Sequence, residues 1–147
     1  MITTSNPTQY NTKVLQFVKC SSEYWEFVRE LRNDERVQHG FIERLEITKE
    51  QQIKYMNRFQ DHYFICLLNG QPAGYVGVIE GDIRICTSPK FQSQGIGSFM
   101  LEEIMKVFPD AFGKVKIDNI ASKKMFEKLG FKETFIIYTR QKTSTSN

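Results

Sequence analysis

A polar turn with two glycines, Gln92-Ser93-Gln94-Gly95-Ile96-Gly97, joins an apolar run at 83–87 to a segment of helical periodicity at 98–108. A helix that begins directly after such a turn points several backbone N–H groups at one spot, where its dipole adds positive potential. Gly95 and Gly97 leave room for an anion to approach the backbone. The turn therefore predicts a strand–turn–helix unit that holds a phosphate-bearing cofactor.

Two common nucleotide motifs do not fit this turn. A P-loop requires Lys and then Ser or Thr after its last glycine, and neither glycine here is followed by that pair. A dinucleotide fingerprint requires a third glycine three residues after the second, where this chain has Met100. Taken alone, the turn is equally consistent with a plain helix start that contains two turn glycines.

A second motif lies downstream, where Asn119 is followed by Ser122, Phe126 and Gly130-Phe131. Together, the two motifs resemble those of the GNAT superfamily of acetyl-CoA-dependent N-acetyltransferases. In that family the first motif holds the CoA pyrophosphate and the second lines the other side of the cofactor. The resemblance extends from about Tyr63 to Tyr138.

The resemblance implies that acetyl-CoA is the co-substrate of the chain. It also implies that main-chain groups of the central strand pair with the pantetheine arm as an added strand would. The expected cofactor-binding residues are Ile85, Cys86, Thr87, Gln92, Ser93, Gln94, Gly95, Ile96, Gly97, Ser98, Asn119, Ser122 and Phe126.

Composition limits the remaining classes of function. A chain of 147 residues with 40% hydrophobic and 25% charged residues fits one globular domain, expected at 13–140 between polar tails at 1–12 and 141–147. The net charge of +3 and the lack of a Lys/Arg run argue against a nucleic-acid partner. The sequence contains no apolar run of membrane-spanning length and no signal peptide, so we expect a cytoplasmic protein without a membrane partner.

The three cysteines indicate a reducing compartment. The chain has an odd number of cysteines, Cys20, Cys66 and Cys86. They lack Cys-x-x-Cys spacing, and each lies in an apolar run. We therefore expect three small core side chains, with neither a disulfide framework nor a metal site. The sequence is compatible with either a monomer or a homodimer.

The order of elements predicts an α+β fold, β-α-α-β-β-β-α-β-α-β, with a mixed sheet flanked by helices. Asn69-Gly70 and Glu80-Gly81 are hairpin turns, and Thr48 with Gln51 forms a capping box. A helix between the strands at 82–87 and 115–118 makes those two strands parallel. The expected strands are 13–20, 63–68, 73–79, 82–87, 115–118 and 131–140, and the expected helices are 23–33, 48–59, 98–108 and 120–129, with an irregular connection at 33–47.

Acetyl transfer to an amine requires a base, and a proton donor assists departure of the thiol. Glu80 and Asp82 flank the entrance to the central strand and are the candidate bases, with His39 as a further candidate. Phe126 stands where the family usually has a tyrosine that serves the departing sulfur, so Tyr138 becomes the candidate donor. Solvated turn carboxylates and an exposed loop histidine remain open alternatives for these residues.

The acceptor site is expected between the first helix and the 33–47 connection. Arg36, His39 and Glu43 are the candidate substrate-binding residues, and they suit a phosphate-bearing sugar. The sequence favours transfer to a primary amine of a small molecule, such as an amino-sugar nucleotide, in a ternary complex. A protein N-terminal acetyltransferase of the ribosomal-protein type and a non-catalytic acyl-CoA-binding regulatory domain remain the alternatives.

Overall fold

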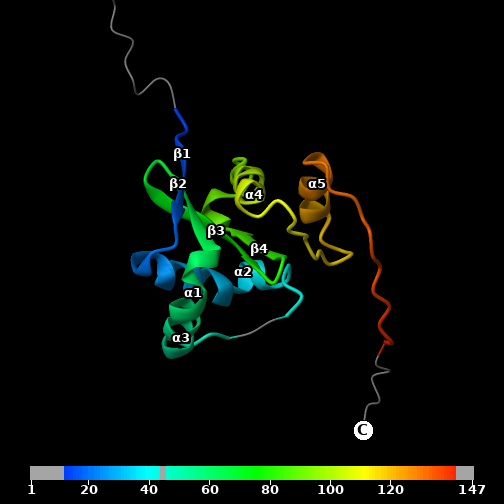
Figure 1. Cartoon of the computed structure of the whole chain (residues 1–147), viewed down its shortest axis with the longest axis horizontal. Coiled ribbons are helices and arrows are strands. Elements are labelled where there is room, and N and C mark those ends of the chain that lie inside the picture. The colour runs from blue at the N-terminus through cyan, green and yellow to red at the C-terminus, as the bar shows by residue number, and fades with distance from the viewer. Residues whose placement is uncertain (1–11, 44–45, 142–147) are drawn as a thin grey trace, which may run out of the picture.

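The computed structural model describes residues 12–43 and 46–141, which form an antiparallel sheet with helices on both faces (Figure 1). The sheet has the order β1-β2-β3-β4, so each strand pairs with its neighbour in the sequence. These strands are β1 (Leu15–Lys19), β2 (Tyr63–Leu68), β3 (Gln71–Ile79) and β4 (Asp82–Thr87).

Two tight turns set the register of the central hairpins. Asn69 and Gly70 have φ angles of 50° and 82°, and Glu80 and Gly81 have φ angles of 52° and 82°. Two successive residues with positive φ make a type I′ turn, whose twist matches that of the strands it joins. Both predicted hairpins are confirmed.

Side chains alternate between the two faces of the sheet, as the twofold period of a strand requires. Val76 and Val78 of β3 pack with Met100, Leu101 and Ile104 in one buried cluster. These three residues belong to α4 (Ile96–Val107), which covers that face. The segment after α4 leads to α5 (Ile120–Lys128), whose Phe126 joins the same cluster.

The opposite face is covered by the N-terminal helices. Tyr63, Ile65 and Tyr75 share a second buried cluster with Val28 and Met56. The helical segments on this side are the 3₁₀ turn η2 (Ser22–Tyr24), α1 (Trp25–Asn33), α2 (Glu35–Gln38) and α3 (Lys49–Phe59). Two further 3₁₀ turns are η3 (Gln60–His62) before β2 and η4 (Pro89–Phe91) after β4.

One helix start has the predicted capping box, and another has no side-chain cap. Thr48 Oγ1 accepts from Gln51 N at 3.1 Å while Gln51 Oε1 accepts from Thr48 N at 2.9 Å, which is the predicted capping box. Ser21 does not cap its helix, because its hydroxyl donates to Glu23 Oε1 at 2.9 Å instead. The predicted irregular connection at 33–47 contains α2, which Asp34 caps by accepting from Arg36 N.

The predicted α+β class is confirmed, but the strands predicted at 115–118 and 131–140 are not regular strands. The parallel contact with β4 occurs earlier, as a single bridge between Asp82 and Phe112. Ile83 N donates to Phe112 O at 2.9 Å and Phe112 N donates to Gly81 O at 2.8 Å. Beyond Phe112 the chain leaves β4, and a strand without a partner to bond has no ladder to hold it.

Cys20, Cys66 and Cys86 are buried, as the sequence predicts. Within the described residues, no helix has the length and hydropathy needed to cross a membrane. The predicted tails at 1–12 and 141–147 lie almost wholly outside the described residues.

Candidate active site

A large cleft opens between β4, the start of α4 and α5, with a volume of about 810 Å³. Twelve of the thirteen predicted cofactor residues line it, from all three of these elements. The exception is Gln94, whose carbonyl accepts from Lys13 Nζ at 2.9 Å. The twelve are Ile85, Cys86, Thr87, Gln92, Ser93, Gly95, Ile96, Gly97, Ser98, Asn119, Ser122 and Phe126.

The first turn of α4 leaves backbone donors free at this cleft. Ser93 and Gly95 have positive φ angles of 62° and 79°, which turn the chain sharply into the helix. No side chain caps α4, and its first backbone bond runs from Phe99 N to Gly95 O at 3.0 Å. Among the described residues, the amides of 93–98 donate no backbone hydrogen bond, so they suit the oxygens of a phosphate group.

Gly97 lies where α4 meets β4 and α5. A Cβ atom at this position would lie 2.8 Å from Met125 Sδ and 3.5 Å from Thr87 Oγ1. All three residues line the cleft, so a side chain at Gly97 would project into the gap between β4 and α5. The glycine therefore keeps this part of the cleft open.

Asn119 both caps α5 and faces the cleft. Its Oδ1 accepts from Ser122 N at 3.2 Å, which satisfies one of the free amides at the helix start. Its Nδ2 lies 3.2 Å from the position that a Cβ on Gly40 would take. The cap therefore uses the oxygen of the amide and leaves the nitrogen as a donor toward the cleft.

Phe126 is at once a cleft residue and a core residue. It is 8% exposed, and its ring meets Phe131 edge-on with centroids 5.0 Å apart. A Cβ on Gly113 would lie only 2.3 Å from Phe126 Cε1, so the ring rests directly on the backbone at Gly113. This packing fixes the ring at the wall of the cleft.

The cleft carries several cations. Asp82 Oδ2 lies 3.2 Å from Arg84 Nε and 3.7 Å from Lys114 Nζ. Arg36 Nη2 lies 2.7 Å from Asp34 Oδ2. The guanidinium carbon of Arg32 lies 5.9 Å from the centroid of the Tyr55 ring. Arg32, Arg36, Arg84 and Lys114 all line the cleft.

Phenol and thiol groups also line the cleft. Tyr63 and Tyr75 are 2% and 3% exposed, and the Tyr63 hydroxyl shares a 2.7 Å hydrogen bond with that of Tyr55. Burial raises the pKa of both Tyr63 and Tyr75 above their usual range, so the phenols keep their protons. Burial also raises the pKa of Cys86 to about 12, which leaves a neutral thiol rather than a nucleophile.

Comparison with known proteins agrees with this geometry. Residues 22–131 match the model of the acetyltransferase (GNAT) family. The chain belongs to this family. The acetyltransferase uses acetyl-CoA as co-substrate, and the free amides of α4 and the open gap at Gly97 fit the phosphate groups of such a molecule. No group of residues in the described part of the acetyltransferase could hold a metal ion.

Solved structures share the fold of this acetyltransferase at low sequence identity. The aminoglycoside N-acetyltransferase AAC(6')-Iy, in complex with CoA, is 16% identical with a TM-score of 0.67, over 90% of this chain and 97% of that chain. A spermidine N-acetyltransferase from Vibrio cholerae, in complex with CoA and spermine, is 15% identical with a TM-score of 0.71, over 82% of each chain. A ribosomal-protein-alanine N-acetyltransferase from Brucella melitensis is 16% identical with a TM-score of 0.68, over 82% of this chain and 86% of that chain. The search of curated proteins gave no match.

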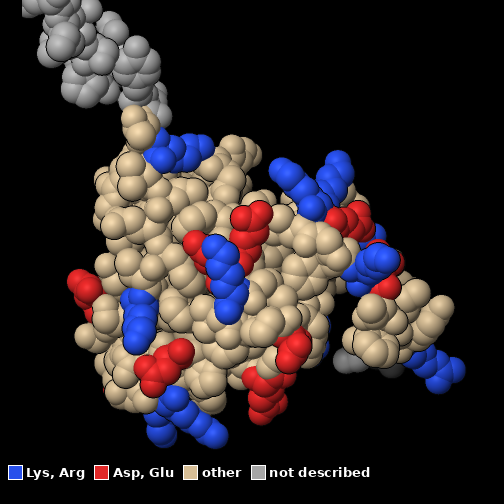
Figure 2. Space-filling model, turned by 45° about the horizontal axis from the view of Figure 1, so that its top comes forward, with Lys and Arg blue, Asp and Glu red and all other residues tan. Residues whose placement is uncertain are grey.

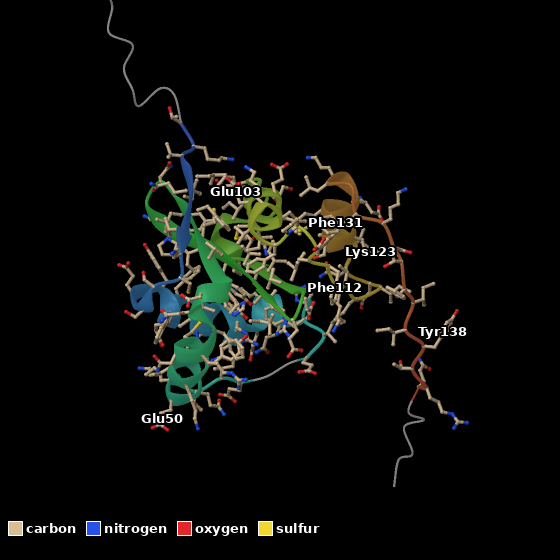
Figure 3. All side chains as sticks on the ribbon, in the orientation of Figure 1. Glu50, Glu103, Phe112, Lys123, Phe131 and Tyr138 are labelled. Carbon is tan, nitrogen blue, oxygen red and sulfur yellow. The ribbon has the colours of Figure 1, made fainter. Side chains whose placement is uncertain are left out.

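Of the six predicted catalytic and substrate residues of the acetyltransferase, four line the cleft and two do not. Asp82, Arg36, His39 and Glu43 line the cleft. Glu80 does not, because it occupies the tight turn before β4, with a φ of 52°. Tyr138 does not either, because it is 91% exposed on the segment after α5, well away from the sheet (Figure 3).

Five residues with a phenol or a charged group line the cleft but were not among the predicted site residues: Arg32, Tyr63, Tyr75, Arg84 and Lys114. Tyr63 and Tyr75 follow the ordinary alternation of core residues in a strand, so nothing in their pattern marks them as cleft residues. The sequence could have marked Arg84 as a cleft residue, because it is a charged residue inside an otherwise apolar strand.

Proposed function

We propose that the enzyme transfers the acetyl group to a primary amine on a small molecule that also carries an anionic group, as an amino-sugar nucleotide does. The observation that carries this proposal is the set of guanidinium groups in the cleft. Arg32, Arg36 and Arg84 line it together with His39. Guanidinium groups bind phosphate and carboxylate oxygens through paired hydrogen bonds, so they favour an anionic acceptor.

Arg32 is the most available of the three cations. Arg36 already pairs with Asp34, and Arg84 with Asp82. Within the described residues, no carboxylate lies in ion-pair distance of Arg32. An acceptor phosphate would therefore supply the negative partner that this guanidinium lacks.

Acetyl-CoA supplies the acetyl group as a thioester, and side chains of the cleft handle the protons. Tyr75 holds a protonated phenol in the cleft, beside Cys86, its partner in the register of β3 and β4. We infer that this phenol, rather than that of Tyr138, hydrogen-bonds the departing sulfur. Asp82 orients Arg84 and Lys114, and its direct action as a base remains a prediction.

The structural relatives suggest acceptors to compare. Three of them are named for an aminoglycoside, spermidine and a ribosomal-protein alanine. A polyamine is cationic and would be repelled by the arginines of this cleft. A peptide N-terminus carries no anionic group and would leave the arginines without a partner. Both types of acceptor are therefore expected to react more slowly than an anionic amine.

A panel of acceptors tests the proposal. Turnover would be measured with an amino-sugar nucleotide, an amino-sugar phosphate, the same free amino sugar, spermidine and a peptide with N-terminal alanine. We expect kcat/KM to be highest for the two phosphorylated acceptors. Arg32→Gln should lower kcat/KM for these by about 10- to 100-fold, since hydrogen bonds to charged groups contribute about 1.5–3 kcal/mol.

The matched control is Arg58→Gln, because Arg58 lies over the Phe59 ring on α3 and does not line the cleft. This variant should leave all kinetic constants unchanged, and Arg32→Gln should leave the KM for acetyl-CoA unchanged. Equal kcat/KM values for phosphorylated and free amino sugars would refute the anionic acceptor. Turnover confined to the peptide would instead identify a protein N-terminal acetyltransferase.

A further inference from the structure

Tyr55 contacts two residues of the cleft although it does not line the cleft itself. It is a half-buried residue of α3. Its hydroxyl shares a 2.7 Å hydrogen bond with that of Tyr63, and the guanidinium carbon of Arg32 lies 5.9 Å from the centroid of its ring. Because Arg32 and Tyr63 both line the cleft, Tyr55 connects two cleft side chains from outside the cleft.

The Tyr63 ring is a rigid support for this connection. Tyr63 pairs with Gly77 in the register of β2 and β3, and a Cβ on Gly77 would lie 2.5 Å from Tyr63 Cδ1 and 2.6 Å from Cε1. The ring therefore rests directly on the backbone of β3. Burial raises the pKa of Tyr63 above its usual range, so its hydroxyl stays neutral and bonds Tyr55 without carrying a charge.

The plane of the Tyr55 ring is fixed by two aromatic neighbours. The Tyr63 ring meets it edge-on with centroids 6.0 Å apart, and the Phe59 ring lies one turn further along α3 with centroids 4.8 Å apart. Arg32 lies over the face that these contacts leave in place. A guanidinium within about 6 Å of an aromatic centroid is attracted to the negative face of the ring.

The helices that carry the ring and the guanidinium are tied to each other. Gln52, one turn before Tyr55 on α3, donates from Nε2 to Trp25 O on α1 at 2.8 Å. Asn33, at the end of α1, exchanges two hydrogen bonds of 2.8 Å with the backbone of Ile47, directly before α3. The two helices therefore lie side by side in a fixed relation (Figure 1).

Arg32 depends on such a support more than its neighbours do. Within the described residues, no carboxylate lies in ion-pair distance of Arg32. Over the face shown in Figure 2, Lys and Arg lie among Asp and Glu rather than in one basic patch, so the binding of an anion relies on individual side chains. An arginine that is already oriented when the anion arrives loses less conformational freedom on binding it.

We propose that Tyr55 is a positioning residue for acceptor recognition, which holds Arg32 in the orientation that binds the anionic group of the acceptor. The inference rests on the proposed function, because it concerns the recognition of that anionic group. The face of the Tyr55 ring orients the guanidinium, and the Tyr55 hydroxyl bonds Tyr63, which keeps the ring in place. Tyr55 acts through Arg32 and does not touch the acceptor.

The test compares turnover of an amino-sugar phosphate with turnover of the same free amino sugar. Tyr55→Leu removes the aromatic face and should lower kcat/KM for the phosphorylated acceptor by about 2- to 30-fold. The values for the free amino sugar and the KM for acetyl-CoA should stay unchanged. Tyr55→Phe keeps the face and loses the hydroxyl, so it should have the smaller effect.

A double-mutant cycle separates positioning from a general loss of structure. In the Arg32→Gln background, Tyr55→Leu should cause no further loss, because no guanidinium is left to orient. Tyr24→Leu is the matched control, since Tyr24 is a half-buried tyrosine packed against the same buried cluster and does not line the cleft. It should leave all kinetic constants unchanged, and thermal unfolding confirms that each variant is folded.

A loss that is selective for the phosphorylated acceptor and absent in the Arg32→Gln background supports the inference. An equal loss with both acceptors, or a loss that persists in that background, overturns it. If Arg32→Gln lowers kcat/KM for the phosphorylated acceptor and Tyr55→Leu does not, the inference fails while the proposed function stands. Equal kcat/KM values of the wild type for the two acceptors refute the proposed function and this inference with it.

Discussion

Substitutions of Gly97 can separate two effects of a side chain at this position, which are crowding against α5 and repulsion of the CoA phosphates. A Cβ there would lie 2.8 Å from Met125 Sδ, so any side chain at this position requires the Met125 side chain of α5 to move. The same side chain would also lie beside the free amides at the start of α4, where we expect the CoA phosphates. Gly97→Gln and Gly97→Glu have nearly the same shape and differ in charge, so the pair distinguishes crowding from electrostatics.

The crowding effect is expected in both variants. Overpacking costs about 1–3 kcal/mol, which corresponds to a fall in melting temperature of roughly 2–4 °C for each kcal/mol in a chain of this size. Without ligand, Gly97→Glu should be the more stable of the two by about 0.3–1 kcal/mol, because a carboxylate in the first turn favours the helix dipole.

The order reverses when CoA binds. A carboxylate about 4 Å from a phosphate charge is repelled by about 1–4 kcal/mol, depending on the local dielectric constant. Gly97→Glu should therefore bind CoA about 5- to 1000-fold more weakly than Gly97→Gln, and added salt should narrow that difference. Calorimetric titration at two salt concentrations measures both effects.

Gly95→Ala is the control for backbone strain. Gly95 has a φ of 79°, but a Cβ there would meet no atom within 4 Å. Its substitution should cost about 1 kcal/mol of stability without obstructing the cleft. Equal CoA affinity for the Gly97→Glu and Gly97→Gln variants would refute the placement of the phosphates at this turn.

Further substitutions test the other cleft residues. Asn119→Ala should weaken CoA binding by about 1–3 kcal/mol and also lower stability by about 1 kcal/mol, whereas Asn119→Asp should keep the cap and lose only affinity, as calorimetry and thermal unfolding would show. Tyr75→Phe should lower kcat by at least about tenfold, while Tyr138→Phe should change it by less than about twofold; the reverse order would return the donor role to Tyr138. Burial raises the pKa of Cys20 and Cys86 from 9.0 to about 12, so between these values only the unfolded chain loses the two thiol protons. In urea unfolding, the contribution of these two thiols to the free energy of unfolding should be constant below about pH 8. Above about pH 9 it should fall by up to about 1.4 kcal/mol per pH unit for each thiol. The double variant Cys20→Ala, Cys86→Ala should show a smaller fall.

The sequence alone determined the features that depend on short-range chemistry. The Asn69-Gly70 and Glu80-Gly81 turns require positive φ angles at successive residues, which glycine and asparagine adopt readily. The Thr48–Gln51 capping box and the glycine turn before α4 follow from spacing within a few residues. The resemblance of the two motifs to those of the acetyltransferase family predicted thirteen cofactor residues, and twelve of them line the cleft.

Only the tertiary structure decided the features that depend on a distant partner. The sequence patterns at 115–118 and 131–140 favour strands, yet a strand requires a neighbouring edge, and within the described residues only Phe112 finds one. Tyr138 was expected in the site because such a strand would have carried it there. Arg32, Tyr75 and Arg84 come from separate elements, and they meet at one cleft because the helices and strands pack in this arrangement.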